Sequence, residues 1–117
     1  MKVAKFGGSS LADAAHVKQV CNIILADRDR RLVVVSAPGK RFSDDTKVTD
    51  MLYSCNALAE EGADFSGLLA SIKERYDLII KGLGLDLSLD EEFATIEKQL
   101  KNKAGADYAA SRGEYLN

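Results

Sequence analysis

The sequence is poor in the residues that build metal sites and disulfides. It contains one histidine and two cysteines in 117 residues, and the cysteines form no C-x-x-C pair, so a zinc site would lack ligands. Cys21 and Cys55 both fall on apolar faces of expected helices, where cysteine is usually a small core residue in a reducing compartment. His16, in the first expected helix, is interpreted as structural. We therefore expect no metal ion bound by protein side chains alone.

Long apolar runs and an excess of basic residues are also absent. No apolar run is longer than four residues, far below the roughly 20 that a membrane-spanning helix needs, and the start of the chain lacks the apolar stretch of a secretory signal. The net charge is −2 at pH 7, whereas nucleic-acid-binding proteins usually carry a basic excess. We expect no membrane partner, no nucleic-acid partner and a cytoplasmic location. A hydrophobic fraction of 46% is typical of one globular domain.

What the sequence does contain is a glycine turn between a strand and a helix at its start. Residues 1–4 form a short strand pattern, and from Asp13 apolar residues recur at helical spacing. Between them lies Lys5-Phe6-Gly7-Gly8-Ser9-Ser10. Adjacent glycines let the backbone approach a ligand, the N-terminus of the following helix favours an anion, and Lys5 can add a positive charge. The stretch predicts a phosphate cradle. A tight turn beside a surface lysine also fits, because neither common phosphate-binding fingerprint is present.

A second strand and a polar loop follow the first helix. Residues 31–36 read as a strand, and the run Leu32-Val33-Val34-Val35 suits a strand buried on both faces of a parallel sheet. Ala37-Pro38-Gly39 then marks a turn, and residues 40–47 form a charged loop. Ligands of open α/β sheets bind at the carboxyl ends of strands. We therefore expect this loop and the glycine turn to line one crevice, with an ordinary solvated loop as the alternative.

The rest of the chain is predicted to be helical. Helices are expected from residue 48 or 49 to about 61, from 64 to about 80, from 89 to about 103, and from 107 to the end. Asp64 and Asp107 are expected to cap two of them, and Ser88 and Glu91 to form a capping box at a third. No third strand is found, although two strands do not make a stable open sheet. The pattern indicates the front part of an α/β domain.

Four motifs, in order, resemble the start of an aspartokinase, a member of the amino acid kinase superfamily. They are Lys5-Phe6-Gly7-Gly8-Ser9-Ser10, Val35-Ser36-Ala37-Pro38-Gly39, Val48-Thr49-Asp50-Met51-Leu52 and Ser111-Arg112-Gly113-Glu114. Ser9 stands where aspartokinases usually have threonine, which keeps the hydroxyl group. The resemblance implies a carbamate kinase-like, three-layer α/β fold with a mainly parallel sheet, helix-rich after residue 48. Residues 1–117 would form the N-terminal portion of the catalytic domain, without the ACT regulatory domains.

The same resemblance implies an activity. ATP and L-aspartate would give ADP and 4-phospho-L-aspartate, the step that opens lysine, threonine and methionine biosynthesis, with Mg²⁺ bridging the phosphates. The substrate carboxylate is itself the nucleophile, so catalysis would consist of positioning and charge stabilisation. The resemblance implies that Lys5 neutralises charge on the transferring phosphoryl group and that the phosphates are bound by Lys5, Gly7, Gly8 and Ser9. Ser36 and Thr49 would line the crevice for aspartate and the phosphoryl group. Glu114 would pair with the α-ammonium group of the substrate.

Without the resemblance, Glu114 would be interpreted as a solvated helix carboxylate and Thr49 as a helix cap. Aspartokinases continue well beyond the matching segment, so the chain alone is expected to be inactive and its parent to be a homo-oligomer. Two alternatives stay open. One is a non-catalytic, phosphate-binding or self-associating fragment, suggested by the missing third strand. The other is a kinase of the same superfamily for another carboxylate. The role of the loop 40–47 also stays open, with a lid over the phosphates as one hypothesis.

Overall fold

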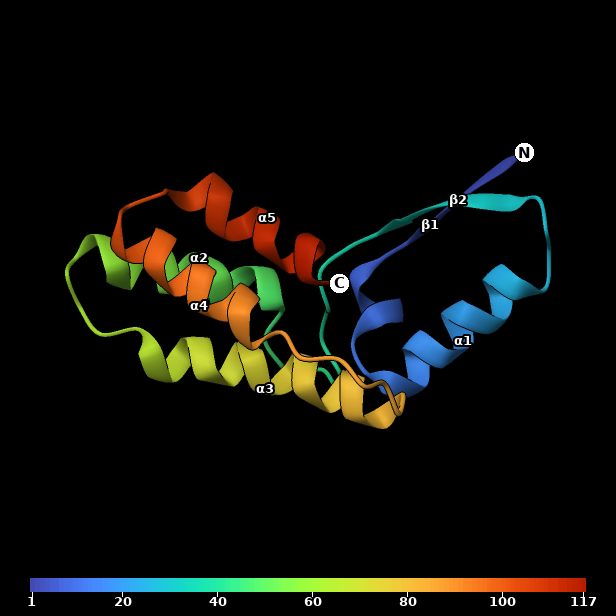
Figure 1. Ribbon diagram of the computed structural model, residues 1–117, viewed down its shortest axis with the longest axis horizontal. Coiled ribbons are helices and arrows are strands. Elements are labelled where there is room, and N and C mark those ends of the chain that lie inside the picture. Colours follow the sequence, from blue (N-terminus) through green and yellow to red (C-terminus); the bar gives the residue numbers. More distant parts are fainter.

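The computed structural model describes all 117 residues, which fall into a strand-containing part and a helical part (Figure 1). In the first part, α1 lies beside the two strands β1 and β2. In the second part α2, α4 and α5 gather together, and α3 runs along both parts. The elements are β1 (Lys2–Phe6), a 3-10 helix η1 (Gly8–Leu11), α1 (Ala14–Leu25), β2 (Arg30–Val35), α2 (Val48–Glu60), α3 (Ser66–Gly82), α4 (Asp90–Lys101) and α5 (Ala106–Leu116).

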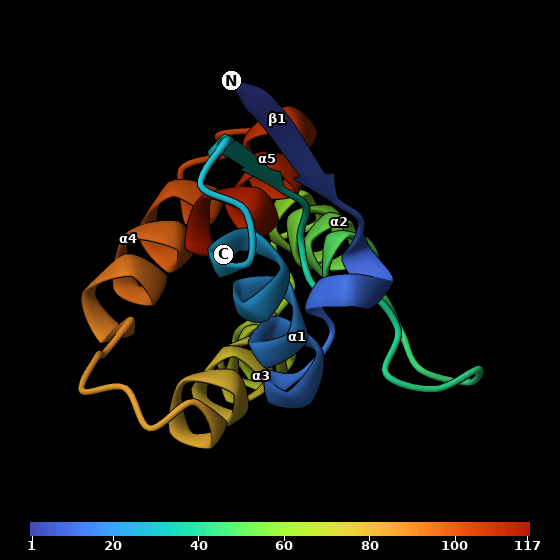
Figure 2. The same ribbon diagram turned by 90° about the vertical axis from the view of Figure 1, so that its right-hand side faces the viewer.

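The two strands are parallel, as expected, and their carboxyl ends meet at the same edge. Phe6 pairs with Val35, so the chain leaves both strands at neighbouring points. Figure 2 shows β1 and β2 side by side, with the loop from β2 to α2 projecting away from the helices. The expectation that Leu32-Val33-Val34-Val35 is buried on both faces is wrong, because Leu32 is 49% and Val34 48% exposed. The sheet has only two strands, and the helices leave much of its surface uncovered.

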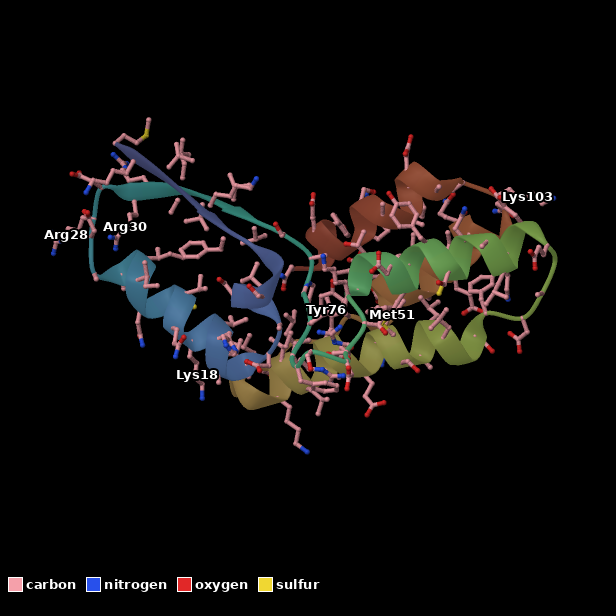
Figure 3. The ribbon with its side chains drawn as sticks, turned by 180° about the vertical axis from the view of Figure 1, so that it is seen from behind. Lys18, Arg28, Arg30, Met51, Tyr76 and Lys103 are labelled. Carbon is pink, nitrogen blue, oxygen red and sulfur yellow. The ribbon has the colours of Figure 1, made fainter.

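The core lies in the helical part. Most of its fully buried side chains come from α2, α3 and α4, and the largest are Leu52, Ile72, Ile96 and Leu100. The rings of Tyr76 and Phe93 pack with their centres 6.0 Å apart. Figure 3 shows Tyr76 within the molecule, whereas Lys18 points outward from α1. The predicted helices are confirmed, and the apolar faces of α2, α3, α4 and α5 meet one another rather than the sheet.

Several details at helix ends differ from the expectations. The capping box does not form: the Ser88 hydroxyl accepts the Asp90 N–H, and α4 begins at Asp90. Asp107 lies inside α5, which begins after Gly105. Asp64 does accept a hydrogen bond from the backbone N–H of Ser66, as a cap residue would (2.9 Å). These differences arise because several side chains in a polar stretch can satisfy the first N–H groups of a helix.

The two cysteines differ in their environments. Cys55 is fully buried in the core of α2, as predicted, whereas Cys21 on α1 is exposed and the prediction of a core residue is wrong there. Only Val20 of α1 is buried, because α1 has little more than η1, α3 and the small sheet to pack against. None of the helices combines the length and the apolar composition that crossing a bilayer requires.

Candidate functional site

A cleft of about 540 Å³ opens at the carboxyl ends of the two strands. It brings together five residues that the sequence analysis singled out, although they lie far apart in the chain. Glycine, hydroxyl and charged groups dominate its walls, and only Ala37 and Pro38 contribute apolar side chains. The lining residues are Gly8, Ser9, Ser36, Ala37, Pro38, Gly39, Lys40, Lys47, Thr49 and Glu114.

The two strand-end loops touch each other through their glycines. The N–H of Gly39 donates a hydrogen bond of 2.8 Å to the carbonyl oxygen of Gly8. A Cβ atom on Gly39 would lie 2.6 Å from the carbonyl carbon of Gly8, and one on Gly8 would lie 3.0 Å from the carbonyl oxygen of Ala37. Because side-chain carbon does not fit there, glycine permits the backbones to approach. The expectation that both loops line one crevice is thus met by the geometry.

The helix end that faces the cleft is not the one expected. After Gly7 the chain forms the short helix η1, with the Ser10 N–H bonded to the Gly7 carbonyl oxygen (3.1 Å). The long helix α1 starts only at Ala14, and the Asp13 carboxylate accepts the His16 N–H (2.9 Å). The negative charge of Asp13 therefore occupies the N-terminal end of α1. This hydrogen bond to the His16 N–H lowers the pKa of Asp13.

Instead, the start of α2 borders the cleft. The Val48 N–H donates to the carbonyl oxygen of Pro38 (3.1 Å), which ties the helix to the β2 loop. Lys47 is the residue before α2, and its side chain makes no capping hydrogen bond. Thr49 is half-buried in the first turn, so it is not the helix cap. Lys47 and Thr49 are the polar residues that line this side of the cleft.

Glu114 reaches the cleft because α5 packs closely against the β2 loop. A Cβ atom on Gly113 would lie 2.6 Å from the Cβ of Ala37, so the helix can approach only with glycine there. The buried Tyr76 hydroxyl donates to the Gly113 carbonyl oxygen (2.7 Å). The Asn117 side-chain amide donates to the Ser36 carbonyl oxygen (2.7 Å). Glu114 itself is exposed, and its carboxylate is the only one among the lining residues.

Lys5 and Gly7 are not among the residues that line the cleft. Successive side chains of a strand point to opposite faces, and in β1 the alternation leaves Lys5 exposed between the half-buried Ala4 and Phe6. Gly7 is exposed as well, and a Cβ atom there would meet nothing within 4 Å. Both residues lie next to the glycine turn in the chain, but the structure brings only Gly8 and Ser9 of this motif into the cleft wall.

Two lysines of the cleft were not predicted from the sequence. Lys40 and Lys47 stand at the two ends of the charged loop, and both line the cleft. Their signal in the sequence was their placement directly beside the turn after β2 and directly before α2. Between them, the Arg41 guanidinium donates to the Asp45 carboxylate at 2.7 and 3.1 Å. This pairing orders the loop and holds the pKa of the Asp45 carboxyl well below its usual range.

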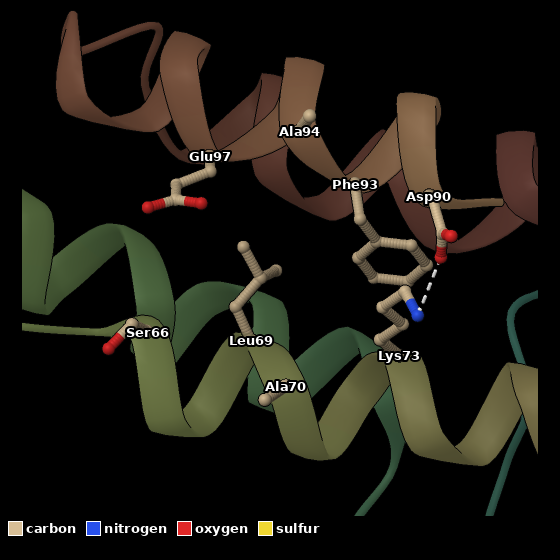
Figure 4. Close-up of a pocket in the computed structure, with 8 residues that line it drawn as sticks. All are labelled: Ser66, Leu69, Ala70, Lys73, Asp90, Phe93, Ala94 and Glu97. Atoms are coloured by element: carbon tan, nitrogen blue, oxygen red, sulfur yellow. Dashed lines mark ion pairs between the residues drawn. The ribbon is translucent and has the colours of Figure 1, made fainter.

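A second cavity, of about 290 Å³, lies between α3 and α4 (Figure 4). The ring of Phe93 and the side chain of Leu69 line it. Its one cation, Lys73, is already bonded to two carboxylates, those of Asp90 (2.7 Å) and Asp77 (3.2 Å). The one cation of this cavity is therefore already neutralised, whereas Lys40, Lys47 and Glu114 in the cleft form no ion pairs. The cleft is the better candidate for binding a charged ligand.

The sequence matches the amino acid kinase family over residues 1–117. Aspartokinase 3 of Bacillus subtilis (strain 168) is 46% identical over 92 residues, which cover 79% of this chain and 20% of the relative. The crystal structure of the Clostridium acetobutylicum aspartate kinase is 46% identical, with a TM-score of 0.95 over 98% of this chain and 27% of that chain. Aspartokinase III of E. coli, solved in complex with aspartate and ADP, is 30% identical with a TM-score of 0.66 over 97% of this chain and 26% of that chain.

These likenesses confirm the resemblance that the four motifs indicate and the α/β fold that it implies. The chain spans only 20% of the B. subtilis relative and 27% of the C. acetobutylicum structure.

Proposed function

The chain belongs to the amino acid kinase family, and we propose that it supplies the phosphate- and aspartate-binding part of an aspartokinase. The parent enzyme would transfer the γ-phosphoryl group of ATP to the side-chain carboxylate of L-aspartate. The observation that carries this proposal is the gathering of Gly8, Ser9, Ser36, Thr49 and Glu114 in one cleft. It is supported by the likeness to the E. coli enzyme that was solved with aspartate and ADP.

The phosphate end of the site would be the glycine turn. Gly8 and Ser9 offer backbone N–H groups without a large side chain in the way, and the Ser9 hydroxyl adds a further donor. Gly7 and Lys5 lie next to them in the chain, and Lys5 would turn toward the transferring phosphoryl group. Mg²⁺ would arrive as part of MgATP, because it prefers phosphate oxygens and water with few protein carboxylates. In this role the protein stabilises charge that develops during transfer.

The aspartate end would lie across the cleft. The Glu114 carboxylate would pair with the α-ammonium group of the substrate, and the hydroxyls of Ser36 and Thr49 would donate hydrogen bonds to its carboxylates or to the phosphoryl oxygens. An oxygen of the side-chain carboxylate then attacks the γ-phosphorus, the bond to the bridging oxygen breaks, and ADP leaves. The nucleophile is already ionised at neutral pH, so no general base is required.

The finer statements about the parent are also proposals. Residues 1–117 would form the N-terminal portion of its catalytic domain, and the reaction would begin lysine, threonine and methionine biosynthesis. The uncovered sheet suggests that further strands or a further subunit complete the site, in agreement with a homo-oligomeric parent. Two unpaired cysteines suit the reducing cytoplasm.

The test is aspartate-dependent phosphoryl transfer from MgATP, with the acyl phosphate trapped by hydroxylamine. This chain and the product of the complete open reading frame that contains it are assayed side by side. Each is tested with L-aspartate and, in separate reactions, with L-glutamate and N-acetyl-L-glutamate as alternative acceptors. We expect activity with L-aspartate only in the complete product. A folded complete product that is inactive with L-aspartate would refute the proposal, and activity with another acceptor would identify a different carboxylate kinase.

A second candidate function has its own observation. The sheet has only two strands, so each strand has one unpaired edge that can bond to another strand. Val3 is 63% and Leu32 49% exposed on this sheet. The chain would then be a non-catalytic, anion-binding module that associates with a second copy of itself. Sedimentation equilibrium of this chain distinguishes the two cases, because a folded monomer at high concentration would contradict self-association.

A further inference from the structure

The side chain of Arg75 is buried against the loop that borders the cleft, although no residue of its helix, α3, lines the cleft. Arg75 is 5% exposed. Its guanidinium donates to three backbone carbonyl oxygens from distant parts of the chain: those of Gly39 (2.5 Å), Thr46 (2.7 Å) and Ala12 (3.4 Å). It therefore joins both ends of the β2–α2 loop to the segment that leads into α1.

Burying a guanidinium is costly unless its charge and its donors are satisfied. Burial lowers the pKa of Arg75, and the Asp45 carboxylate lies 3.9 Å from its Nη2 atom as partial compensation. Asp45 in turn accepts both hydrogen bonds from Arg41. The Nε atom of Arg75 has no hydrogen-bond partner. Burial of Arg75 therefore costs folding stability, and its hydrogen bonds fix the backbone of the β2–α2 loop.

The anchored positions stand next to the two lysines of the cleft. Gly39 precedes Lys40 and Thr46 precedes Lys47. Because one guanidinium holds the carbonyl oxygens of both preceding residues, it determines where each lysine leaves the backbone. Both lysines are exposed, and neither takes part in an ion pair. The cleft therefore presents two unpaired cations and a single carboxylate, that of Glu114.

We propose that Lys40 and Lys47 bind an anionic oxygen group in the cleft and that Arg75 is the positioning residue that holds them in place. The group is a phosphate of the nucleotide or a carboxylate of the amino acid substrate. Either one would gain a charge-assisted hydrogen bond from each lysine. The inference rests on the proposed function, since it names further residues of the same cleft as the partners of the ligand's negative charge. It makes the loop 40–47 a fixed wall of the site rather than a mobile lid.

The test measures binding of tripolyphosphate, MgADP and L-aspartate by calorimetry, using the complete protein that contains this sequence. Lys40→Ala and Lys47→Ala are each compared with Lys18→Ala, which removes the same charge from the exposed face of α1. We expect each cleft variant to weaken binding about tenfold and the control to leave it unchanged. Weaker binding of tripolyphosphate and MgADP identifies a phosphate as the group, whereas weaker binding of L-aspartate identifies a carboxylate.

The positioning role has a separate readout. Arg75→Lys keeps the charge but cannot donate to Gly39 and Thr46 with one planar fork. In that background we expect Lys40→Ala to cost much less than the tenfold it costs in the wild type, because the lysine is no longer held. Equal losses in both backgrounds would overturn the role of Arg75. Wild-type binding that neither cleft lysine affects would overturn the inference alone, whereas a wild type that binds none of the three ligands would overturn the proposed function as well.

Discussion

The N–H of Gly39 donates a hydrogen bond of 2.8 Å to the carbonyl oxygen of Gly8, so the loop after β2 rests directly on the turn after β1. This contact creates the floor of the cleft. It depends on two glycines at positions that lie in separate motifs of the sequence, and a Cβ atom on Gly39 would come within 2.6 Å of backbone carbon. The cleft therefore exists only while both backbones remain this close.

Gly39→Ala is expected to push the two loops apart. The new methyl group meets backbone atoms, which cannot turn aside as a flexible side chain can, so the free energy of unfolding should fall by about 1–3 kcal/mol. The affinity for phosphate should also fall, and the loss of binding free energy should exceed the loss in the free energy of unfolding. Gly67→Ala is the matched control, because a Cβ atom there meets nothing within 4 Å and alanine favours a helix. Urea unfolding and phosphate titration measure the two effects, and a Gly39→Ala variant that binds normally would contradict this account of the floor.

Gly113→Ala should loosen α5 from the β2 loop. Its methyl group would lie 2.6 Å from the Ala37 Cβ and 3.4 Å from a Leu52 methyl carbon. Alanine gains helix propensity of at most about 1 kcal/mol, so we expect the overlap to win and the variant to be destabilised by about 1–2 kcal/mol. Adding Ala37→Gly removes the nearest atom and should restore part of the loss. Thermal unfolding of both variants measures this, and a double variant no more stable than Gly113→Ala would argue against the contact.

The buried thiol of Cys55 should make the protein less stable in alkali. Burial raises the pKa of Cys55 to about 11 from its ordinary value of 9.0. Between these values the unfolded chain loses the proton and the folded one keeps it, so the free energy of unfolding falls as pH rises, by at most about 1.4 kcal/mol per pH unit. Below pH 9 the contribution is fully present. Cys55→Ala should remove this slope from urea-unfolding curves, whereas Cys21→Ala, at an exposed site, should retain it.

The helices and the order of the elements could be predicted because their signals are local. Apolar spacing within α2, α3 and α4 depends on neighbouring residues, and so does the β-branched run of β2. Burial of the strands could not be predicted from that run. Leu32 and Val34 have the composition of a doubly covered strand, but burial depends on which other elements lie against them, and here the sheet has two strands.

The candidate site was predictable where one motif supplies both a backbone shape and a polar group, as at Gly8 and Ser9. It was not predictable at Arg75, whose three acceptors lie 29, 36 and 63 residues away in the chain. One signal did exist: Arg75 occupies the same helical face as the buried Ile72 and Ile79. A charged residue at an apolar position of a helix indicates a buried, hydrogen-bonded role.

Lys5→Ala should strongly reduce turnover of the proposed aspartokinase while leaving its stability nearly unchanged. Lys5 is exposed and forms no ion pair, so the fold loses little. If Lys5 stabilises the transferring phosphoryl group, kcat should fall by about 10²–10³-fold, with a smaller change in KM for MgATP. Lys18→Ala serves as the control of equal charge. Full turnover after Lys5→Ala, measured by hydroxylamine trapping, would show that the lysine has no role in phosphoryl transfer.

Glu114→Gln tests how the site recognises an amino acid rather than a simple dicarboxylate. The substitution keeps the shape of the side chain and removes its charge, so under the proposed role of Glu114 the α-ammonium group of L-aspartate loses an ionic partner. We expect KM for L-aspartate to rise about tenfold to hundredfold, as for the loss of a hydrogen bond to a charged group, with KM for MgATP unchanged. N-acetyl-L-aspartate, which has no ammonium group, should be a poor acceptor for both proteins, and the variant should therefore discriminate less between the two acceptors. Glu91→Gln, an exposed carboxylate of α4, is the control. If Glu114→Gln raised KM for MgATP instead, the carboxylate would face the nucleotide, and the two ends of the cleft would have to be exchanged.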